Sequence, residues 1–317
     1  MRIQFFNIVE PVAPLYRDLL PYLADRGFQV DVIIGKTEYR PGRPPLEDIL
    51  LHENIRIVRV GDGFKAGKGK LRKLGAMLSY GIGAASRTLL GENADLNFFL
   101  TQPPLFSGWG FFLRKFRGER YMCLVMDVYP DVAFQDGVIA ERSLAGKLLK
   151  SMAGVILKNA AAIVVIGRCM QERIMSKGIA QEKICIIPNW VNEKEVFPVP
   201  HSDNALRQEI GLTDEFVVLY SGNLGVSHHF DYLLQVAQRC RSLSNLKFVI
   251  IGDGVRRKEI GRAKTGNQLD NLLLLPFQPP ERLADSLSLG DVHFVSLKDG
   301  FEGLEVPSKA YGASNSL

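Results

Sequence analysis

The stretch DVHFVSLKDGFEGLEVPSKAYG, Asp291–Gly312, combines a strand, a loop and the start of a helix. Its first part, through Leu297, is rich in the apolar residues that suit a buried strand. A loop with two glycines follows, and Pro307 predicts the first turn of a helix, where a missing N–H costs nothing. Because the free N–H groups of a helix start attract anions, the stretch predicts a cradle for a phosphorylated, hydroxyl-rich molecule, with Glu302 near its hydroxyls. Such units are also ordinary parts of α/β proteins, so the neighbouring loops must support this interpretation.

Composition limits the class of protein. The 317 residues are 46% hydrophobic and 23% charged, which predicts a folded globular chain of two domains and excludes a disordered one. The net charge of +5 is too small to predict nucleic-acid binding, but it suits an anionic membrane face if the charges cluster. No segment has the ~20 apolar residues of a spanning helix, and the N-terminus resembles a strand rather than a signal peptide, so we expect a cytoplasmic protein. The four cysteines show no metal-ligand spacing; we expect them to be reduced and buried, and we expect no metal site.

The first half alternates between predicted strands and helices. Strands at Arg2–Val9 and Phe28–Ile34, with a helix over Leu15–Arg26 between them, form a right-handed βαβ unit that begins a parallel sheet. Further strands are predicted at Tyr121–Met126, Ala161–Ile166 and Ile184–Pro188. Doubly wound sheets bind ligands at the carboxyl ends of their strands. Glu10 and Arg17, just after the first strand, are therefore candidates for contacting an acceptor, or alternatively are charges at a helix end.

Two carboxylates, Asp127 and Asp131, directly follow the predicted strand Tyr121–Met126. At the carboxyl edge of a sheet they suit the binding of substrate hydroxyls or the orientation of a catalytic group. Asp131 can equally cap the next helix.

Basic residues cluster in two places without nearby acids. Residues 65–90 contain no acidic residue, and five basic ones stand near their start: Lys65, Lys68, Lys70, Arg72 and Lys73. Residues 109–116 interleave aromatic side chains with Arg114 and Lys115. These segments predict either solvated loops leading into core helices or contact with an anionic bilayer, and the sequence leaves both open.

A polar segment with two prolines, Glu193–Asp203, predicts a linker between domains at 1–192 and 204–317. The strand and helix pattern restarts after it.

Three predicted strands of the second half end in loops that suit a ligand: Phe216–Tyr220, Leu246–Ile251 and Leu272–Leu275. The first two loops contain glycines, which let a backbone approach a phosphate closely, although neither has the spacing of a dinucleotide site. Their candidate residues are Gly222, Asn223, Gly252, Asp253 and Gly254. The third loop offers Phe277 and Gln278 as a surface for a nucleobase edge.

Six segments, in this order and along nearly the whole chain, resemble motifs of retaining glycosyltransferases of the GT-B architecture. They are DVYPD at Asp127, VVIGRCMQERIMSKG at Val164, KICIIPNWVN at Lys183, VLYSGNLG at Val218, VIIGDG at Val249 and FEGLEVPSKAYG at Phe301. The most similar branch builds bacterial O-antigen, capsule and related surface polysaccharides and includes amino-sugar transferases. The resemblance implies an α/β fold of two Rossmann-like parallel-sheet domains facing across a cleft, with the acceptor mainly on the first and the nucleotide-sugar donor mainly on the second.

The resemblance also implies roles for particular residues. Glu302 falls on the first glutamate of the family's glutamate, seven residues, glutamate motif and would bind donor-sugar hydroxyls, while Lys309 would neutralise phosphate charge. The main-chain N–H groups that would hold the diphosphate belong to Gly303, Leu304, Glu305 and Val306. The implied donor is a nucleotide sugar, UDP-linked and of the N-acetylhexosamine type, with no cofactor and no metal. The implied acceptor is a polyprenyl-diphosphate-linked glycan, which places the protein at the inner face of the plasma membrane with no nucleic-acid partner.

The chain departs from its relatives in four ways. Many relatives carry a histidine just before the Asp127 position, where this chain has Met126. Many relatives carry an arginine and a lysine where this chain has Asn223 and then His228 and His229. The second glutamate, expected near Gly312, is absent, and the relatives continue beyond Leu317. We therefore expect an incomplete second domain and little activity, and we keep two alternatives: an inactive remnant that binds membrane or glycolipid, and a sugar-nucleotide epimerase.

Overall fold

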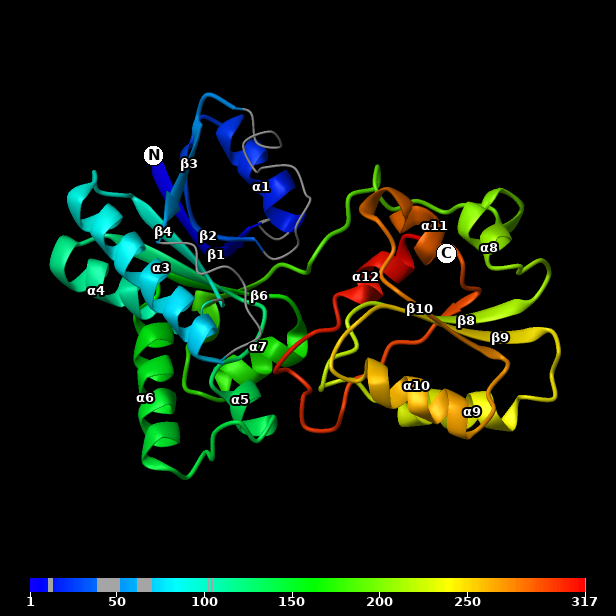
Figure 1. Cartoon of the computed structure of the whole chain (residues 1–317). Coiled ribbons are helices and arrows are strands. Elements are labelled where there is room, and N and C mark those ends of the chain that lie inside the picture. Colours follow the sequence, from blue (N-terminus) through cyan, green and yellow to red (C-terminus); the bar gives the residue numbers. More distant parts are fainter. Residues whose placement is uncertain (11–13, 39–51, 62–69, 102, 104, 317) are drawn as a thin grey trace. The chain divides into compact units, whose positions relative to one another are not determined.

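The computed structural model describes residues 1–10, 14–38, 52–61, 70–101, 103 and 105–316. The chain divides into two compact units (Figure 1). Unit 1 contains Met1–Pro188 and Gly303–Val306, and unit 2 contains Asn189–Glu302 and Pro307–Leu317. The short segment Gly303–Val306 thus belongs to unit 1, although it lies near the end of the sequence.

Unit 1 is built on a seven-stranded parallel sheet in the order β3-β2-β1-β4-β5-β6-β7. Its strands are β1 (Arg2–Glu10), β2 (Gln29–Glu38), β3 (Ile55–Val60), β4 (Leu96–Leu100), β5 (Arg120–Val125), β6 (Ala162–Val165) and β7 (Ile184–Ile186). The strands predicted in this half are confirmed within a few residues, whereas β3 and β4 were not predicted. The sequence of β3, IRIVRV, places two arginines among its apolar residues, which hides the strand pattern.

The helices of unit 1 cover both faces of this sheet. They are α1 (Pro14–Ala24), α3 (Lys70–Leu90), α4 (Gly108–Arg117), α5 (Asp131–Gln135), α6 (Leu144–Asn159) and α7 (Arg168–Met175). The crossover through α1 runs in the opposite direction along the strand order from those through α3, α4 and α6, and right-handed crossovers then place α1 on the other face (Figure 1). Aromatic side chains fill the core beneath α4, where Phe6 and Phe99 stack with ring centroids 4.4 Å apart.

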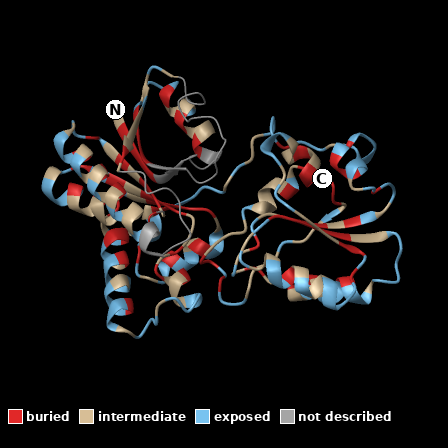
Figure 2. Ribbon diagram, in the orientation of Figure 1, coloured by how far each residue is buried: buried red, intermediate tan, exposed pale blue. Residues whose placement is uncertain are grey.

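Unit 2 is built on a four-stranded parallel sheet in the order β10-β9-β8-β11. Its strands are β8 (Phe216–Ser221), β9 (Leu246–Ile251), β10 (Leu272–Leu275) and β11 (Val292–His293), and its helices are α8 (Ala205–Glu209), α9 (Asp231–Arg239), α10 (Arg257–Gly266), α11 (Leu283–Leu287) and α12 (Lys309–Ser314). Alternate residues of β8 enter two different cores, with Tyr220 in one and Val217 and Leu219 in the other. The central strands β1, β5, β8 and β9 contribute much of the buried core, whereas the edge strands β7 and β11 are partly exposed (Figure 2).

Two expectations for the stretch Asp291–Gly312 need correction. The strand predicted to reach Leu297 is the two-residue β11, because it pairs with β8 alone at the edge of the sheet. The helix begins at Lys309 with Ser308 as its N-cap, so Pro307 precedes the helix rather than forming its first turn.

Candidate functional site

The glycine loops after β8 and β9 contact each other at the carboxyl edge of the unit 2 sheet. Gly222, Gly252 and Gly254 have φ values of 148°, 151° and 152°, a region that favours glycine. A Cβ at Gly252 would lie 1.9 Å from the Gly222 carbonyl oxygen, and one at Gly254 would lie 2.5 Å from the Leu224 carbonyl oxygen. The sequence interpretation assigned these glycines to the approach of a phosphate. The structure shows that the approach of the two loops to each other already requires them.

Lys309 lies beside these loops. Its Nζ donates a hydrogen bond to the Tyr220 hydroxyl at 2.7 Å and lies 2.9 Å from His228 Nε2. The ammonium nitrogen also lies 4.3 Å from the centroid of the Tyr220 ring. A Cβ at Gly222 would lie 3.2 Å from Lys309 Cε. The ammonium group of Lys309, the first residue of α12, therefore lies at the end of β8.

His228 is a neutral partner of this cation. Its Nδ1 lies 2.8 Å from the Ser296 carbonyl oxygen, which can only accept, so Nδ1 carries the proton and Nε2 presents its lone pair to Lys309. Burial, and then the charge of Lys309, lower the pKa of His228. The imidazole is therefore neutral near pH 7. The Tyr220 hydroxyl donates to the Asn223 carbonyl oxygen at 2.6 Å and completes the cluster.

The other donor-side candidates of unit 2 contribute exposed or locally bonded side chains. Glu302 and Phe277 are exposed. Asp253 is exposed, and its carboxylate accepts from the Gly254 N–H at 2.8 Å. Gln278 Nε2 donates to the Pro276 carbonyl oxygen at 3.1 Å, within its own loop.

The segment predicted to hold the diphosphate, Gly303–Val306, lies in unit 1. The Val128 N–H donates to the Leu304 carbonyl oxygen at 2.7 Å, and Asp127 forms an antiparallel bridge with Glu305. Leu304 is fully buried. The predicted cradle is thus divided, with residues 303–306 in unit 1 and both Glu302 and Lys309 in unit 2.

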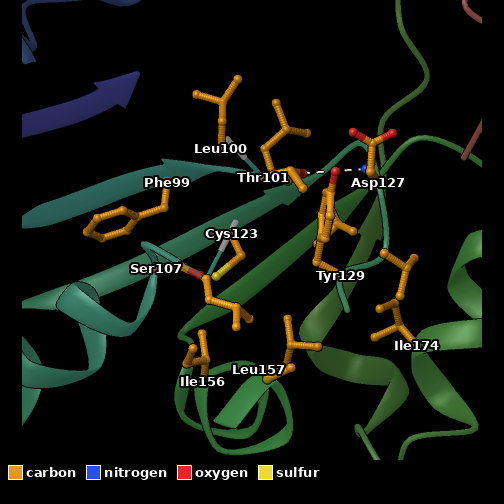
Figure 3. A pocket seen from close by; sticks show the side chains of 15 residues that line it. Phe99, Leu100, Thr101, Ser107, Cys123, Asp127, Tyr129, Ile156, Leu157 and Ile174 are labelled. Carbon is orange, nitrogen blue, oxygen red and sulfur yellow. Dashed lines mark hydrogen bonds between the residues drawn. The ribbon is translucent and has the colours of Figure 1, made fainter. Parts of the chain in front are cut away.

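Asp127 lines a small pocket of about 50 Å³ at the carboxyl ends of β4 and β5 (Figure 3). Thr101 and Asp127 lie at one end of the pocket and the α6 residues Ile156 and Leu157 at the other. Burial, and then the negative charge of Glu305, raise the pKa of Asp127 to about 6. A carboxyl group with such a pKa can take up or release a proton near neutral pH, as a general base must.

The structure describes the surroundings of the acceptor-side candidates to different extents. The Asp131 carboxylate accepts from Lys177 Nζ, with 2.6 Å to each oxygen, and lies 3.8 Å from Arg173 Nε. This ion pair joins the start of α5 to the residues around α7 and favours a structural role. Arg17 is half-buried on α1. Glu10 ends β1, and its side chain lies outside the described residues, so contacts of Glu10 and Arg17 with an acceptor stay predictions.

Several remaining expectations are tested only in part. Lys65 and Lys68 lie outside the described residues, as do the side chains of Lys70, Arg72 and Lys73. The expectation of four buried cysteines was wrong, because Cys169, at the start of α7, and Cys185, on the edge strand β7, are exposed. In the described part of the chain, no helix has the length and apolar character needed to cross a membrane.

Sequence reasoning missed three contributors to these two sites. By sequence alone, Tyr220 is only the end of a strand, His228 only a departure from relatives, and Glu305 only a donor of a main-chain N–H. A polar-tipped aromatic at the carboxyl end of an apolar strand was the available signal for Tyr220. No local pattern indicates that Glu305 lies beside Asp127.

Two α/β units, each with a parallel sheet, define the GT-B class of fold. The solved structure of HepE from Anabaena in complex with UDP and glucose shares this fold with a TM-score of 0.62 at 15% identity, covering 92% of this chain and 73% of that chain. Residues 12–190 match the family described as Glycosyl transferase 4-like domain, and residues 202–304 match Glycosyl transferases group 1. The chain therefore belongs to this family of glycosyltransferases, and the family and fold predicted from its motifs are confirmed.

Two curated proteins are similar over much of the chain. The probable glycosyltransferase WbjE of Pseudomonas aeruginosa is 31% identical over 199 residues, which are 63% of this chain and 50% of that protein. The putative colanic acid biosynthesis glycosyl transferase WcaI of Escherichia coli is 29% identical over 213 residues, 65% of this chain and 52% of that protein. The chain spans about half the length of these relatives.

Proposed function

We propose that this chain transfers a sugar from a UDP-sugar donor to a lipid-linked saccharide in surface polysaccharide biosynthesis. Its family, together with relatives described as glycosyltransferases and in one case as belonging to colanic acid biosynthesis, supports this activity. The complex of HepE with UDP and glucose supports the choice of donor. We propose an N-acetylhexosamine as the sugar, retention at its anomeric carbon, and work at an anionic membrane surface where such acceptors lie.

The contacts of Lys309 carry the proposal. Departure of a nucleoside diphosphate leaves negative charge on phosphate, and a cation that is already in place stabilises that charge without reorganisation. The Tyr220 hydroxyl and His228 Nε2 fix the ammonium group of Lys309 at the sheet edge where α/β folds bind ligands. We therefore assign Lys309 to the donor diphosphate.

The remaining donor contacts follow from this placement. The glycine loops in contact with Lys309 and with each other would line the diphosphate: Gly222, Asn223, Gly252, Asp253 and Gly254. Exposed Phe277 and half-buried Gln278 would contact the base, and exposed Glu302 would bind hydroxyls of the sugar. The main-chain N–H groups of residues 303–306 are also proposed to bind the diphosphate.

On the acceptor side we assign the central role to Asp127. The pKa of Asp127, about 6, suits a carboxylate that accepts a hydrogen bond from an acceptor hydroxyl and can take up the proton of that hydroxyl. Glu10 and Arg17 are proposed to contact other parts of the acceptor.

Isothermal titration with UDP tests the donor site. Lys309→Ala should weaken UDP binding about 10- to 100-fold, because a hydrogen bond from a charged group is worth ~1.5–3 kcal/mol. Lys258→Ala, at an exposed lysine of α10, is the matched control and should leave the affinity unchanged. An unchanged affinity of Lys309→Ala would contradict the assignment.

A second titration separates the sugar from the nucleotide. Glu302→Ala should weaken binding of a UDP-sugar more than binding of UDP, while Glu281→Ala, at another exposed glutamate, should affect neither. Turnover of the UDP-sugar without an acceptor would indicate the epimerase instead, and donor binding with no transfer to any lipid-linked acceptor would indicate a non-catalytic binder.

A further inference from the structure

We infer that the outward faces of α3, α4 and α6 form a docking surface for an anionic lipid bilayer. This inference deepens the proposed function by naming the part of unit 1 that meets the membrane, and it rests on that function for its biological purpose. The observations behind it are independent of the donor site.

The outward face of α6 is an exposed apolar stripe. Leu144, Leu148, Met152 and Val155 recur at spacings of four, four and three residues, the repeat of one helical face, and are 42% to 88% exposed. The opposite face of α6 packs inward through Ala153, Ile156 and Leu157. The helix therefore has two apolar faces, and unit 1 buries only one of them (Figure 2).

Helix α3 repeats this arrangement. Leu74, Leu78 and Ile82 are spaced by four residues and are 53% to 69% exposed, while Tyr80 and Ala84 face the core. Four-residue spacing again places the exposed residues in a single stripe. Isolated exposed leucines are ordinary on protein surfaces, but two helical stripes on one side of a unit are not.

Helix α4 connects the other two and presents aromatic rings. The Phe112 ring stacks on Trp109 at 4.7 Å and contacts Phe116 at 4.4 Å between centroids, and Phe116 is 64% exposed. The indole Nε1 of Trp109 donates to Thr88 of α3 at 2.9 Å, which ties the two helices together. Helix α4 also contacts α6. Phenylalanine and tryptophan rings on the apolar face of a helix suit the boundary between lipid headgroups and acyl chains.

The charges on these three helices all have one sign. Among the side chains that the structure describes, these helices have one basic residue in α3, three in α4 and three in α6, and no aspartate or glutamate. The whole chain has 39 basic and 34 acidic residues, so this bias is local. Lys147 and Lys158 flank the α6 stripe. Lys150 pairs with Glu141 at 2.6 Å and Arg117 of α4 pairs with Glu119 at 3.0 Å, so these two residues add little net charge.

The combination of apolar stripes and uniform positive charge selects a bilayer over a second copy of this chain. A two-fold symmetric contact through these helices would bring like charges together. A surface of anionic headgroups neutralises the lysines and arginines, and the exposed apolar side chains enter the boundary beneath those headgroups. Apolar and charged groups on this side of unit 1 would then both be satisfied by one partner.

Vesicle sedimentation of the whole chain tests the inference. We expect binding to phosphatidylcholine vesicles that contain phosphatidylglycerol, and at least about tenfold weaker binding to phosphatidylcholine alone, because each basic residue contributes separately. Reversal of two charges in Lys147→Glu/Lys158→Glu should weaken binding to the anionic vesicles about tenfold or more. Leu148→Ser/Met152→Ser should weaken it as well and should make the remaining binding more sensitive to salt.

Matched variants in unit 2 control for charge and apolar area. Lys258→Glu/Arg262→Glu on α10 and Tyr232→Ser/Val236→Ser on α9 change exposed residues of the same kinds and should leave vesicle binding unchanged. Circular dichroism confirms that each variant is folded. The inference is overturned if the α6 variants bind anionic vesicles as the parent does, or if the α6 stripe instead proves to drive self-association in sedimentation velocity. UDP titration keeps the proposals apart, because the α6 variants should bind UDP normally and Lys309→Ala should bind vesicles normally.

Discussion

Units 1 and 2 share a parallel-sheet plan and differ in the charge that each places at the carboxyl edge of its sheet. In unit 1, burial and then the negative charge of nearby Glu305 raise the pKa of Asp127. Unit 2 holds the ammonium group of Lys309 between a phenol and a neutral imidazole. In both units the candidate site lies at the carboxyl edge of the parallel sheet. The side chains at the strand ends determine whether that site can bind a proton or an anion.

The largest effect is expected where the unit 2 edge depends on close contact between loops. Gly252→Ala places a Cβ 1.9 Å from the Gly222 carbonyl oxygen at a φ of 151°, so we expect a loss of more than about 3 kcal/mol of unfolding free energy. Gly266→Ala at the end of α10 has nothing within 4 Å of its Cβ and should be neutral or slightly stabilising. Urea unfolding followed by circular dichroism measures both, and parent-like stability of Gly252→Ala would show that the two loops are free to separate.

The acidic edge of unit 1 should make stability depend on pH. Because the pKa of Asp127 is raised to about 6, the folded chain holds a proton that the unfolded chain releases near pH 4, and stability falls as pH rises between these values. The fall amounts to about 2–3 kcal/mol, and Asp127→Asn should remove it.

Trp109 fluorescence in a Trp190→Phe background reports this unfolding from unit 1 alone, since Trp190 belongs to unit 2. Asp136→Asn, at an exposed carboxylate just beyond α5, is the control and should keep the fall. If the free energy of unfolding depends on pH in the same way in Asp127→Asn and in the parent, the proposed electrostatic difference between the two units is wrong.

The smallest effect concerns the neutral groups that hold the unit 2 cation. Tyr220→Phe keeps the ring in the core but removes the hydroxyl that joins Lys309 Nζ to the Asn223 carbonyl oxygen. A net hydrogen bond is worth about 1 kcal/mol, so UDP affinity should fall about fivefold, less than in Lys309→Ala. Titration of Tyr232→Phe, an exposed tyrosine of α9, supplies the control. Equal UDP affinities for Tyr220→Phe and the parent would show that the hydroxyl does not position the cation.

The fold was predictable wherever a strand is a short apolar run with a clear end. β9 and β10 have the predicted bounds, because each run stops at a glycine or a proline. β3 was missed because arginines interrupt it, and β11 was predicted too long because its pairing with β8 ends after two residues. Local pattern shows which residues could form a strand, but the partner decides how many of them do.

The sequence predicted which residues belong to the candidate site better than it predicted how they lie relative to one another. Lys309, Gly222 and Asn223 were singled out from motifs, and the structure brings them together in unit 2. The segment Gly303–Val306, also predicted to bind the diphosphate, belongs to unit 1, so its contact with a diphosphate stays a prediction. The hydrogen bond from Val128 to Leu304 and the burial of Leu304 account for its place in unit 1.

The sequence by itself determined the family, the alternation of strands and helices, and the loops that follow the strand ends, because these depend on residues close together in the chain. Only the tertiary structure decided the charge state and partners of the two edges. The tautomer of His228 depends on Ser296 and Lys309, and the pKa of Asp127 depends on its burial and on Glu305. These interactions join residues far apart in sequence, and their strength is set by desolvation and distance, which only the folded chain defines.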